Sequence, residues 1–310
     1  MDTAAGIVVG ALADSAVGDP RRWHPVAGFG RCAAALEEAI YAPTRARGAV
    51  FTAVCVAATA LVGAVLSRFG ALGVVIATWT ALGGRSLAAV GESMADALDA
   101  GDIEAARALV PSLCGRDPAA LDEAGICRAA VESIAENTSD AAVAPLLAAA
   151  VGGAPGALAY RAVNTLDAMV GYRTERHREF GWASARLDDV ANYLPARLGG
   201  VLAVLLGPRP RQAAQAWKAD AHRHPSPNAG VVEAAFAGAL DLTLGGPTAY
   251  RGYTEDRPVL GGGRRPGVAD VRAAVHLSRR VRAGSLVVAV VLTAGRSAFS
   301  RSRSGRQACA

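Results

Sequence analysis

Long uncharged runs alternate with short polar stretches along the chain, and their lengths predict helices. Residues 49–67 and 69–84 carry no charge, and only Arg68 separates them, so we expect a hairpin of two membrane helices. The uncharged run 141–160 contains the sequence Gly-Gly-Ala-Pro-Gly at 152–156, which a straight helix tolerates poorly. There we expect a re-entrant pair of half-helices or a tight helical hairpin. Further candidate membrane segments are residues 3–18, 198–207 and 284–295.

Composition narrows the fold class. Hydrophobic residues make up 52% of the chain, charged residues 19%, and the mean hydropathy is +0.26. These values are too apolar for an ordinary soluble α/β domain and too charged for a pure bundle of spanning helices. We predict an all-α, polytopic membrane protein with a large helical polar region that faces the cytoplasm, and no β-structure. One membrane-embedded domain is expected over residues 1–295, followed by a basic, disordered tail at 296–310.

Charge indicates partners and orientation. The net charge is +5, the basic residues are almost all arginine, and Lys218 is the only lysine. No basic stripe with interleaved aromatic residues is present, so nucleic acid is excluded, and phosphate ligands or anionic lipid are expected. Arg21-Arg22 follows the first apolar run and predicts that residues 19–47 lie on the cytoplasmic side of the cell (inner) membrane. The side of region 208–283 stays open, because it depends on whether 284–295 spans.

A polar stripe precedes the broken run. Arg128, Glu132, Glu136 and Asp140 recur every fourth residue and therefore share one side of a helix. A charged side chain within a bilayer costs roughly 2.5–3.5 kcal/mol, so these groups must face water, a ligand or one another. The stretch 137–140 either caps a helix that starts near residue 141 or, because it offers several polar groups, helps to form a phosphate site.

Two further polar stripes follow. Asn164 and Asp167 lie three residues apart and lead to Tyr172-Arg173, which is either a helix end at the membrane interface or part of a site. Farther on, Arg186, Asp188, Asp189 and Asn192 gather on another helix face. Adjacent carboxylates suit Mg²⁺, although an exposed helix face paired with Arg186 explains them equally well. We expect the three stripes to converge on one pocket.

Residues 222–230 form a predicted turn before a helix that runs through Glu233. Ser226 or Asn228 is expected to cap this helix. His224 and His222 form a weak metal signal but suit phosphate binding or proton transfer. The glycines at 261–263 lack the Lys-Ser/Thr pair of a phosphate-binding P-loop, so we expect a flexible loop there.

Several ordered motifs together resemble the CobD/CbiB family. They are Gly18-Asp19-Pro20 with His24-Pro25-Val26, Glu132 to Asp140 (ESIAENTSD), Asn164 to Arg173 (NTLDAMVGYR), Phe180-Gly181 with Ala185 to Asp189 (ARLDD), His224 to Gly230 (HPSPNAG), Gly245-Gly246-Pro247 and Tyr250-Arg251-Gly252. One departure is Ala141, where the family usually has Gly. The resemblance implies a membrane-associated adenosylcobinamide-phosphate synthase of cobalamin biosynthesis.

Such an enzyme joins the free propionate carboxylate of adenosylcobyric acid to (R)-1-amino-2-propanol or its O-phosphate, with ATP and Mg²⁺. The expected partners are these substrates, the bilayer and other membrane enzymes of cobalamin assembly. The resemblance and the polar stripes together suggest three sets of residues. The catalytic set is Glu132, Glu136, Asp140, Asp167 and His224; the substrate- and phosphate-binding set is Asn137, Thr138, Asn164, Tyr172, Arg173, Arg186, Asn192, Arg197, Ser226 and Asn228; and the metal set is Asp167, Asp188 and Asp189.

Two other functions also place polar groups over apolar helices. A membrane-embedded, Mg²⁺-dependent prenyltransferase would be expected to show two similar Asp-rich repeats, and the motifs here differ from one another. A corrinoid transporter or scaffold would need more complete membrane spans and would show no turnover. The amide ligase is therefore our preferred hypothesis.

Overall fold

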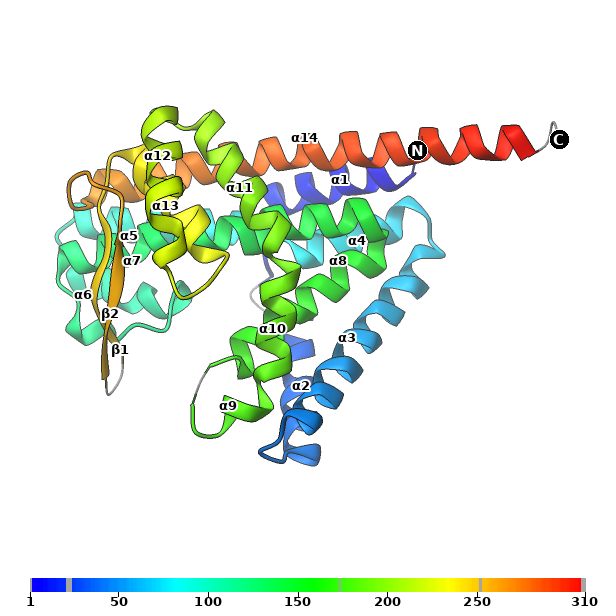
Figure 1. The fold of residues 1–310 in the computed structure, drawn as a ribbon, viewed down its shortest axis with the longest axis horizontal. Helices are drawn as coiled ribbons and strands as arrows, with labels where there is room; N and C mark the ends of the chain where they lie inside the picture. The colour runs from blue at the N-terminus through cyan, green and yellow to red at the C-terminus, as the bar shows by residue number, and fades with distance from the viewer. Residues whose placement is uncertain (1, 21–23, 173, 251–252, 308–310) are drawn as a thin grey trace. The chain divides into compact units, whose positions relative to one another are not determined.

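The computed structural model describes residues 2–20, 24–172, 174–250 and 253–307, most of which are helical (Figure 1). The chain forms two compact units. Unit 1 comprises Met1–Gly83, Ala144–Ala191 and Ser285–Ala310, and unit 2 comprises Gly84–Val143 and Asn192–Gly284. Because the chain passes repeatedly between them, neither unit is one continuous segment of sequence.

Unit 1 is built from helices that pack through small residues. They are α1 (Asp2–Val17), α2 (Pro25–Ile40), α3 (Arg45–Ser67), α4 (Ala71–Ala81), α8 (Ala144–Val170), α9 (His177–Phe180), α10 (Trp182–Ala191) and the C-terminal part of α14 (Val268–Gln307). A Cβ added at Gly6 of α1 would lie 2.6 Å from the Cβ of Val74 in α4, and one at Gly10 would lie 2.8 Å from that of Thr78. These glycines let the two helices approach closely, as the alanine- and glycine-rich composition predicts.

Helix α8 is broken at the Gly-Gly-Ala-Pro-Gly run. Gly153 has φ 62° and ψ −145°, which is not helical, and Pro155 follows it. A Cβ added at Gly156 would lie 2.3 Å from the carbonyl oxygen of Ala148, eight residues earlier. In a straight helix these residues would be about 12 Å apart. The chain therefore folds back on itself here, and the predicted break in this run is confirmed.

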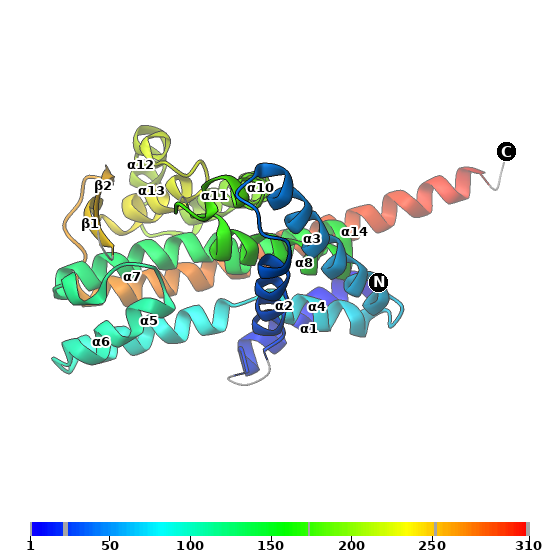
Figure 2. The ribbon, with the colours of Figure 1, turned by 90° about the horizontal axis from the view of Figure 1, so that it is seen from below.

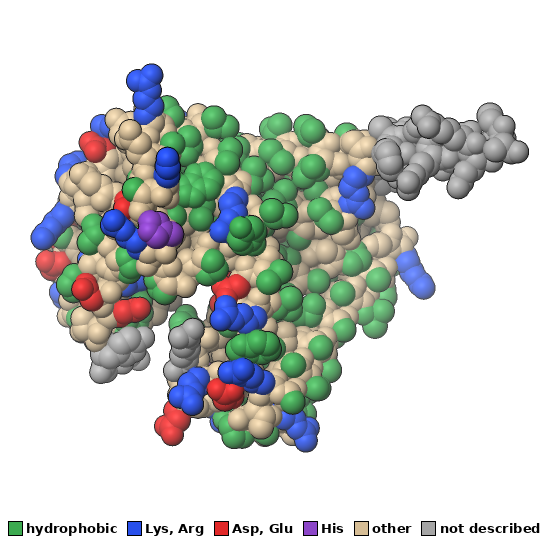
Figure 3. Space-filling model, viewed as in Figure 1, with side chains coloured by type: hydrophobic (Ala, Val, Ile, Leu, Met, Phe, Trp, Pro, Cys, Tyr) green, Lys and Arg blue, Asp and Glu red, His purple; other side chains and the backbone are tan. Residues whose placement is uncertain are grey.

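Three helices are long and apolar enough to cross a membrane, judged by length and composition in the part of the chain that the structure describes. They are Arg45–Ser67, Ala71–Asp99 and Glu123–Val170, and the bent pair Trp182–Ala191 and Tyr193–Leu206 adds a fourth if it counts as one span. The predicted runs 49–67, 69–84 and 141–160 lie largely within them. Helix α3 exposes Val50, Val54 and Leu61, and hydrophobic side chains cover its outer side (Figure 3). By contrast, Thr3–Val17 is shorter than these helices, and the helix that contains 284–295 does not pass the same test.

Unit 2 surrounds one apolar helix. Its elements are α5 (Gly84–Asp99), α6 (Ile103–Leu109), the 3₁₀ turns η1 (Val110–Ser112), η2 (Pro118–Ala120) and η4 (Ala221–Arg223), α7 (Glu123–Thr138), the π-helical turn η3 (Ser139–Val143), α11 (Tyr193–Leu206), α12 (Pro210–Asp220), α13 (Ala229–Leu240), β1 (Leu244–Tyr250), β2 (Tyr253–Leu260) and the N-terminal part of α14. All residues of α13 are buried, and α13 packs against α7, α11, α12 and the strands. Figure 2 shows the first part of α14 running beside α7 and α5, where Arg272 bridges to Asp96 and Asp99 of α5.

The strands correct the prediction that the chain has no β-structure. β1 and β2 pair as an antiparallel hairpin whose register shifts between Leu244 and Gly246. Gly245 and Gly246 take φ values of 81° and 82°, which favour glycine. Glycines, prolines and charged residues interrupt the alternation that normally reveals a strand, so the pattern gave no signal. The hairpin matters for the site because it carries Arg257.

Helix α14 continues to Gln307, so residues 296–307 are helical where the composition predicted disorder. Extending an existing helix needs no new nucleation, which explains why an Arg- and Ser-rich segment can follow an apolar one as helix. Residues 308–310 lie outside the described residues. The same is true of 21–23, on which the cytoplasmic assignment of 19–47 depends.

Candidate functional site

Unit 2 contains a group of ionisable side chains that α13, α7 and the hairpin hold together. We call it the buried ion cluster, and its members are Arg116, Glu132, His224, Glu233 and Arg257. Arg116 precedes η2, Glu132 lies on α7, His224 follows η4, Glu233 lies on α13, and Arg257 lies on β2. Charged groups this deep in a protein are stable only when they pair with one another.

Both oxygens of the Glu132 carboxylate have partners. Arg116 donates a hydrogen bond to Oε2, the backbone N–H of Gly245 donates to Oε1 at 2.7 Å, and Nη1 of Arg257 lies 3.8 Å from Oε2. One turn earlier on α7, Arg128 donates to the carbonyl oxygens of Gly245 and Pro247. These hydrogen bonds from α7 hold the irregular start of β1 in place and so fix the position of the hairpin.

The two cluster arginines remain charged although they are buried. Burial alone disfavours a charged guanidinium, but the charge and hydrogen bond of Glu132 outweigh it and raise the pKa of Arg116. Burial also lowers the pKa of Arg257, but the charges of nearby groups raise it by more. Among these groups, Glu233 has the largest effect. The cluster therefore combines two permanent cations with carboxylates and one imidazole.

Both ring nitrogens of His224 have protein partners. Nη2 of Arg257 lies 2.6 Å from Nε2 of His224, and a guanidinium can only donate, so Nε2 must accept. Nδ1 lies 3.2 Å from the carbonyl oxygen of Ser226, and the backbone N–H of Ser226 donates to it at 3.0 Å. Burial and the charge of Arg257 lower the pKa of His224 from 6.5 to about 4. The imidazole is therefore neutral near pH 7, and both of its nitrogens have protein partners.

Glu233 is the only polar residue in α13. Its Oε1 is buried without a hydrogen-bond partner, 3.6 Å from Nε2 of His224 and 4.0 Å from Nη2 of Arg257. Burial, followed by the charge of Glu132, raises the pKa of Glu233 well above its ordinary value. Arg257, at 4.0 Å, offsets only part of the cost of burying this carboxyl.

One wall of the cluster opens into a hollow of about 460 Å³, which we call the basic hollow. Its polar lining consists of Arg197, Lys218, His222 and His224, and Trp217 closes one side. His224 therefore belongs both to the hollow and to the buried ion cluster. An anionic group is the ligand that this lining favours.

Arg197 is oriented before any ligand arrives. Its guanidinium donates to Oδ1 of Asn228 at 2.9 Å and to the carbonyl oxygen of Pro227 at 3.2 Å, and it lies 3.5 Å from the ring centre of Tyr193. Ser226 Oγ accepts from the backbone N–H of Ala229 at 3.1 Å. Ser226 therefore satisfies the first N–H of α13, whereas Asn228 takes the N-cap position without a side-chain cap hydrogen bond.

The remaining predicted residues of α7 have mixed surroundings. Glu136 is partly exposed and lies within electrostatic range of Arg257, Arg116 and Glu132. Asn137 donates to the carbonyl oxygen of Ser133 at 2.9 Å. Oγ1 of Thr138 lies 2.6 Å from the carbonyl oxygen of Ile134 and 2.6 Å from Oγ of Ser278.

The predicted cap at 137–140 is wrong. Helix α7 passes through η3, which contains Asp140, directly into α8, so no helix begins near residue 141. Asn192 takes the N-cap position of α11, where its buried side chain makes no cap hydrogen bond.

The other two stripes belong to unit 1, apart from Asn192, which belongs to unit 2. On α8, Arg161 donates to Asn164 at 3.4 Å, and Oδ1 of Asp167 lies so close to Gly171 that an added Cβ would be 1.9 Å away. Tyr172 is 59% exposed, and Arg173 lies outside the described residues. On α10, Arg186 donates to Asp189 at 3.1 Å, which is the exposed helix-face pair that the spacing allowed.

The metal set and the convergence of the stripes stay predictions. No group of three or more His, Cys, Asp or Glu side chains suited to a metal occurs in the described part of the chain. Asp188 and Asp189 are adjacent on α10, and Asp188 is partly buried. Glu132 and Glu136 belong to unit 2, whereas Asp167 and Asp188 belong to unit 1.

Sequence reasoning missed three members of the cluster. Glu233 had a usable signal, because it is the single charged residue in an otherwise apolar stretch, 229–240. Arg116 lies in an irregular loop and Arg257 in an unpredicted strand, so no periodicity marked either of them. It also missed Glu37 of α2, whose Oε1 lies 3.0 Å from both Arg176 and His177 and ties the segment after Tyr172 to α2.

Known proteins match nearly the whole length of this chain. The family profile described as CobD/Cbib protein matches residues 7–278. A protein from Mycobacterium tuberculosis named Cobalamin biosynthesis protein CobD is 56% identical, over 93% of this chain and 95% of the relative. Proteins of the same name from Chromobacterium violaceum and Geobacter metallireducens are 44% and 42% identical, covering 90% and 94% of this chain and 93% and 98% of their own. No solved structure is significantly similar.

Proposed function

The chain belongs to the CobD/CbiB family, and on this basis we propose that it acts in cobalamin biosynthesis as an ATP-dependent amide ligase. The proposed reaction joins the free propionate carboxylate of adenosylcobyric acid to the amine of (R)-1-amino-2-propanol or its O-phosphate. The product is adenosylcobinamide or its phosphate.

The chemistry requires activation of the carboxylate. A carboxylate is a poor acyl donor, so one of its oxygens attacks the γ-phosphorus of ATP, giving an acyl phosphate and ADP. The neutral amine then attacks the acyl carbon, the C–O bond to phosphate breaks, and inorganic phosphate leaves. One proton is lost from the attacking nitrogen. The protein must therefore seat phosphate groups and provide a base.

The observation that carries the proposal is the contact between the basic hollow and the buried ion cluster through His224. Arg197 is pre-oriented by Asn228 and Pro227 and has donors suited to a phosphate. His222 lines the same hollow. These groups fit the phosphate of the amine substrate or of ATP.

We assign proton removal to Glu136 rather than His224. Both nitrogens of His224 already have protein partners, and both oxygens of Glu132 do as well. Glu136 is the partly exposed carboxylate near the same two arginines. In this assignment His224 and Glu132 position the cluster, and Glu136 takes the proton from the substrate ammonium.

Mg²⁺ is expected to accompany ATP. An ion that arrives on nucleotide phosphates needs only one or two protein carboxylates, because phosphate oxygens and water complete its shell. Asp188 and Asp189 provide such a pair on α10, with Asp167 of α8 as a further candidate. When bound, the ion would neutralise phosphate charge during transfer.

The three helices of suitable length and hydropathy support a membrane location. We propose that this is the inner (cytoplasmic) membrane with the active face toward the cytoplasm, where ATP is available. A membrane location also makes other membrane enzymes of cobalamin assembly possible partners.

The full chain, purified into lipid nanodiscs, tests the proposal. Incubation with adenosylcobyric acid, the aminopropanol or its phosphate, ATP and Mg²⁺ is expected to give the amide and one ADP per amide. Omitting ATP should abolish the product. Corrinoid binding without ATP-dependent product would instead support a transporter or scaffold.

A further inference from the structure

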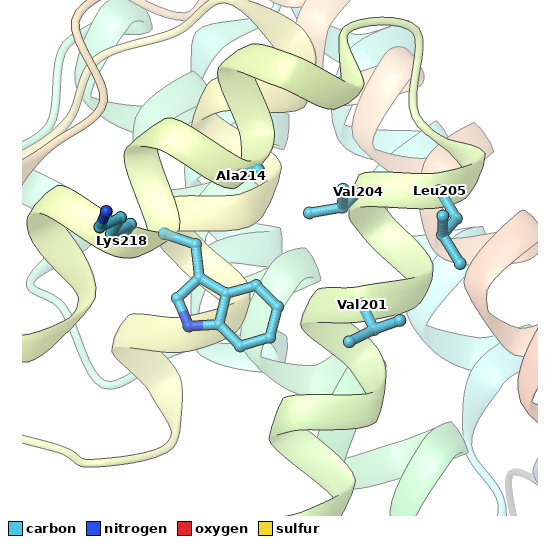
Figure 4. Close-up of a pocket in the computed structure, with 6 residues that line it drawn as sticks. Val201, Val204, Leu205, Ala214 and Lys218 are labelled. Carbon is cyan, nitrogen blue, oxygen red and sulfur yellow. The ribbon is translucent and has the colours of Figure 1, made fainter.

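A second hollow, about 280 Å³ in volume, lies between α11 and α12. We call it the apolar slot, and its lining is Val201, Val204, Leu205, Ala214, Trp217 and the stem of Lys218. Figure 4 shows Val201, Val204 and Leu205 on α11, and Ala214 and Lys218 on α12. Trp217 and Lys218 also line the basic hollow. The two hollows therefore meet at these residues.

Glycine allows the indole to sit at this junction. A Cβ added at Gly200 of α11 would lie 3.1 Å from Cζ3 of Trp217 and 2.8 Å from Cγ1 of Val231. The edge of the indole thus packs on the α11 backbone, while other parts of the ring border both hollows. A rigid aromatic side chain seated in this way separates an apolar compartment from a basic one.

The apolar slot continues onto an exposed apolar surface. Leu194 is 72% exposed, Leu205 68% and Val201 42%. All three lie on α11, which with α10 has the hydropathy of a broken membrane span. Trp and Lys at the end of an apolar surface are typical of the level of lipid headgroups.

We propose that the apolar slot and its junction with the basic hollow bind one anionic phospholipid. An acyl chain lies along Val201 and Val204 beside the indole, and the headgroup phosphate lies at Lys218. The ammonium of Lys218 forms no ion pair among the described residues, so its charge is available. Arg197 and His222, farther along the basic hollow, remain for the substrate.

The lining favours a lipid over a nucleotide. A purine base needs hydrogen-bonding groups at its edge, and the slot offers only aliphatic side chains, one indole and one lysine. An acyl chain needs no such partners. A phosphate next to an apolar slot matches the two halves of a phospholipid.

Quenching of tryptophan fluorescence tests this proposal. The full chain in neutral detergent is titrated with phosphatidylglycerol that carries brominated acyl chains, and separately with brominated phosphatidylcholine. We expect saturable quenching that is stronger for phosphatidylglycerol and absent in Trp217→Phe. Lys218→Gln should weaken the preference for phosphatidylglycerol by about fivefold, and Val204→Phe should remove the saturable component by filling the slot.

Two matched variants serve as controls. Arg211→Gln removes an exposed charge from the same helix, α12, at a position that lines neither hollow. Val65→Phe enlarges a half-exposed valine on α3. Both should bind like the wild type. If Val204→Phe does not fold, Lys218→Gln decides the question, because that side chain is exposed.

Three results would overturn the proposal. Equal quenching by the two lipids in the wild type would show ordinary solvation by lipid. An unchanged lipid preference in Lys218→Gln would remove the headgroup site. Displacement of the saturable component by ATP or inorganic phosphate would show that the junction is a site for soluble phosphate ligands. None of these results depends on ligase turnover.

Discussion

Nη2 of Arg257 lies 2.6 Å from Nε2 of His224 and fixes that imidazole as a hydrogen-bond acceptor. His224 belongs to a motif that can be recognised in the sequence. Arg257 comes from a hairpin that the sequence did not predict. Their contact keeps His224 neutral and leaves neither ring nitrogen for a substrate. This relationship explains why we assign positioning to His224 and proton transfer to Glu136.

His224 should make stability depend on pH below neutrality. Its folded pKa is about 4, below the ordinary 6.5, so the unfolded chain takes up the proton first and acid favours unfolding. We expect the wild type to lose on the order of 3 kcal/mol of unfolding free energy, relative to His224→Gln, between pH 7 and pH 4. Chemical denaturation of both proteins at several pH values measures this difference. Parallel pH profiles would contradict the assigned neutral state.

Removing only one partner of the Arg116–Glu132 pair should strongly destabilise the fold. Arg116→Met or Glu132→Gln leaves an uncompensated buried partner, so each should destabilise the fold by about 3–5 kcal/mol. The double variant should lose less than the sum. Glu104→Gln, which disrupts an exposed pair with Arg107, is the control and should cost less than about 1 kcal/mol. Additive losses in denaturation experiments would show that the pair is not coupled.

Glu233 should make the stability of the fold fall as pH rises. Because its folded pKa is raised, the folded state holds the proton while the unfolded state releases it, and stability is lost as pH rises above the ordinary carboxyl pKa. Glu233→Gln keeps the shape of the side chain but cannot ionise, so it should flatten this slope. Glu233→Ala should cost about 2–4 kcal/mol through the cavity it leaves. Infrared spectroscopy of the carboxyl band over a range of pH offers a direct check, since a Glu233 pKa that is not raised would refute the prediction.

Asp188 and Asp189 should be needed for turnover but not for membrane insertion. Asp188→Asn and Asp189→Asn remove charge proposed for Mg²⁺, and each should lower amide formation by roughly a hundredfold or more. Membrane yield should stay at the wild-type level. Glu38→Gln, an exposed carboxylate on α2, is the matched control and should keep full activity. Full activity in either aspartate variant would remove that residue from the metal site.

The sequence predicts those features of the fold that depend on the length of an apolar run or on glycine and proline residues. The hairpin of 49–67 and 69–84 and the break in 141–160 follow from uncharged runs and from a glycine in a conformation that other residues avoid. The hydrogen bond from the first N–H of α13 to Ser226 follows from local side-chain chemistry. These features depend on neighbours along the chain.

The predictions that were wrong concern features that depend on residues far away in the sequence. The β1–β2 hairpin is fixed by Arg128 and Glu132 of α7, more than a hundred residues earlier, through contacts to Gly245 and Pro247. No local pattern encodes such contacts. The apparent cap at 137–140 failed for a similar reason, because α7 continues through a π-helical turn into α8.

The most direct test of the proposed ligase is the fate of the carboxylate oxygen. Adenosylcobyric acid labelled with ¹⁸O in its free propionate is converted by the purified full chain with ATP, Mg²⁺ and the aminopropanol phosphate, and the released phosphate is analysed by mass spectrometry. The acyl phosphate route predicts ADP and one ¹⁸O atom in each inorganic phosphate. Unlabelled phosphate, or label in AMP, would contradict it.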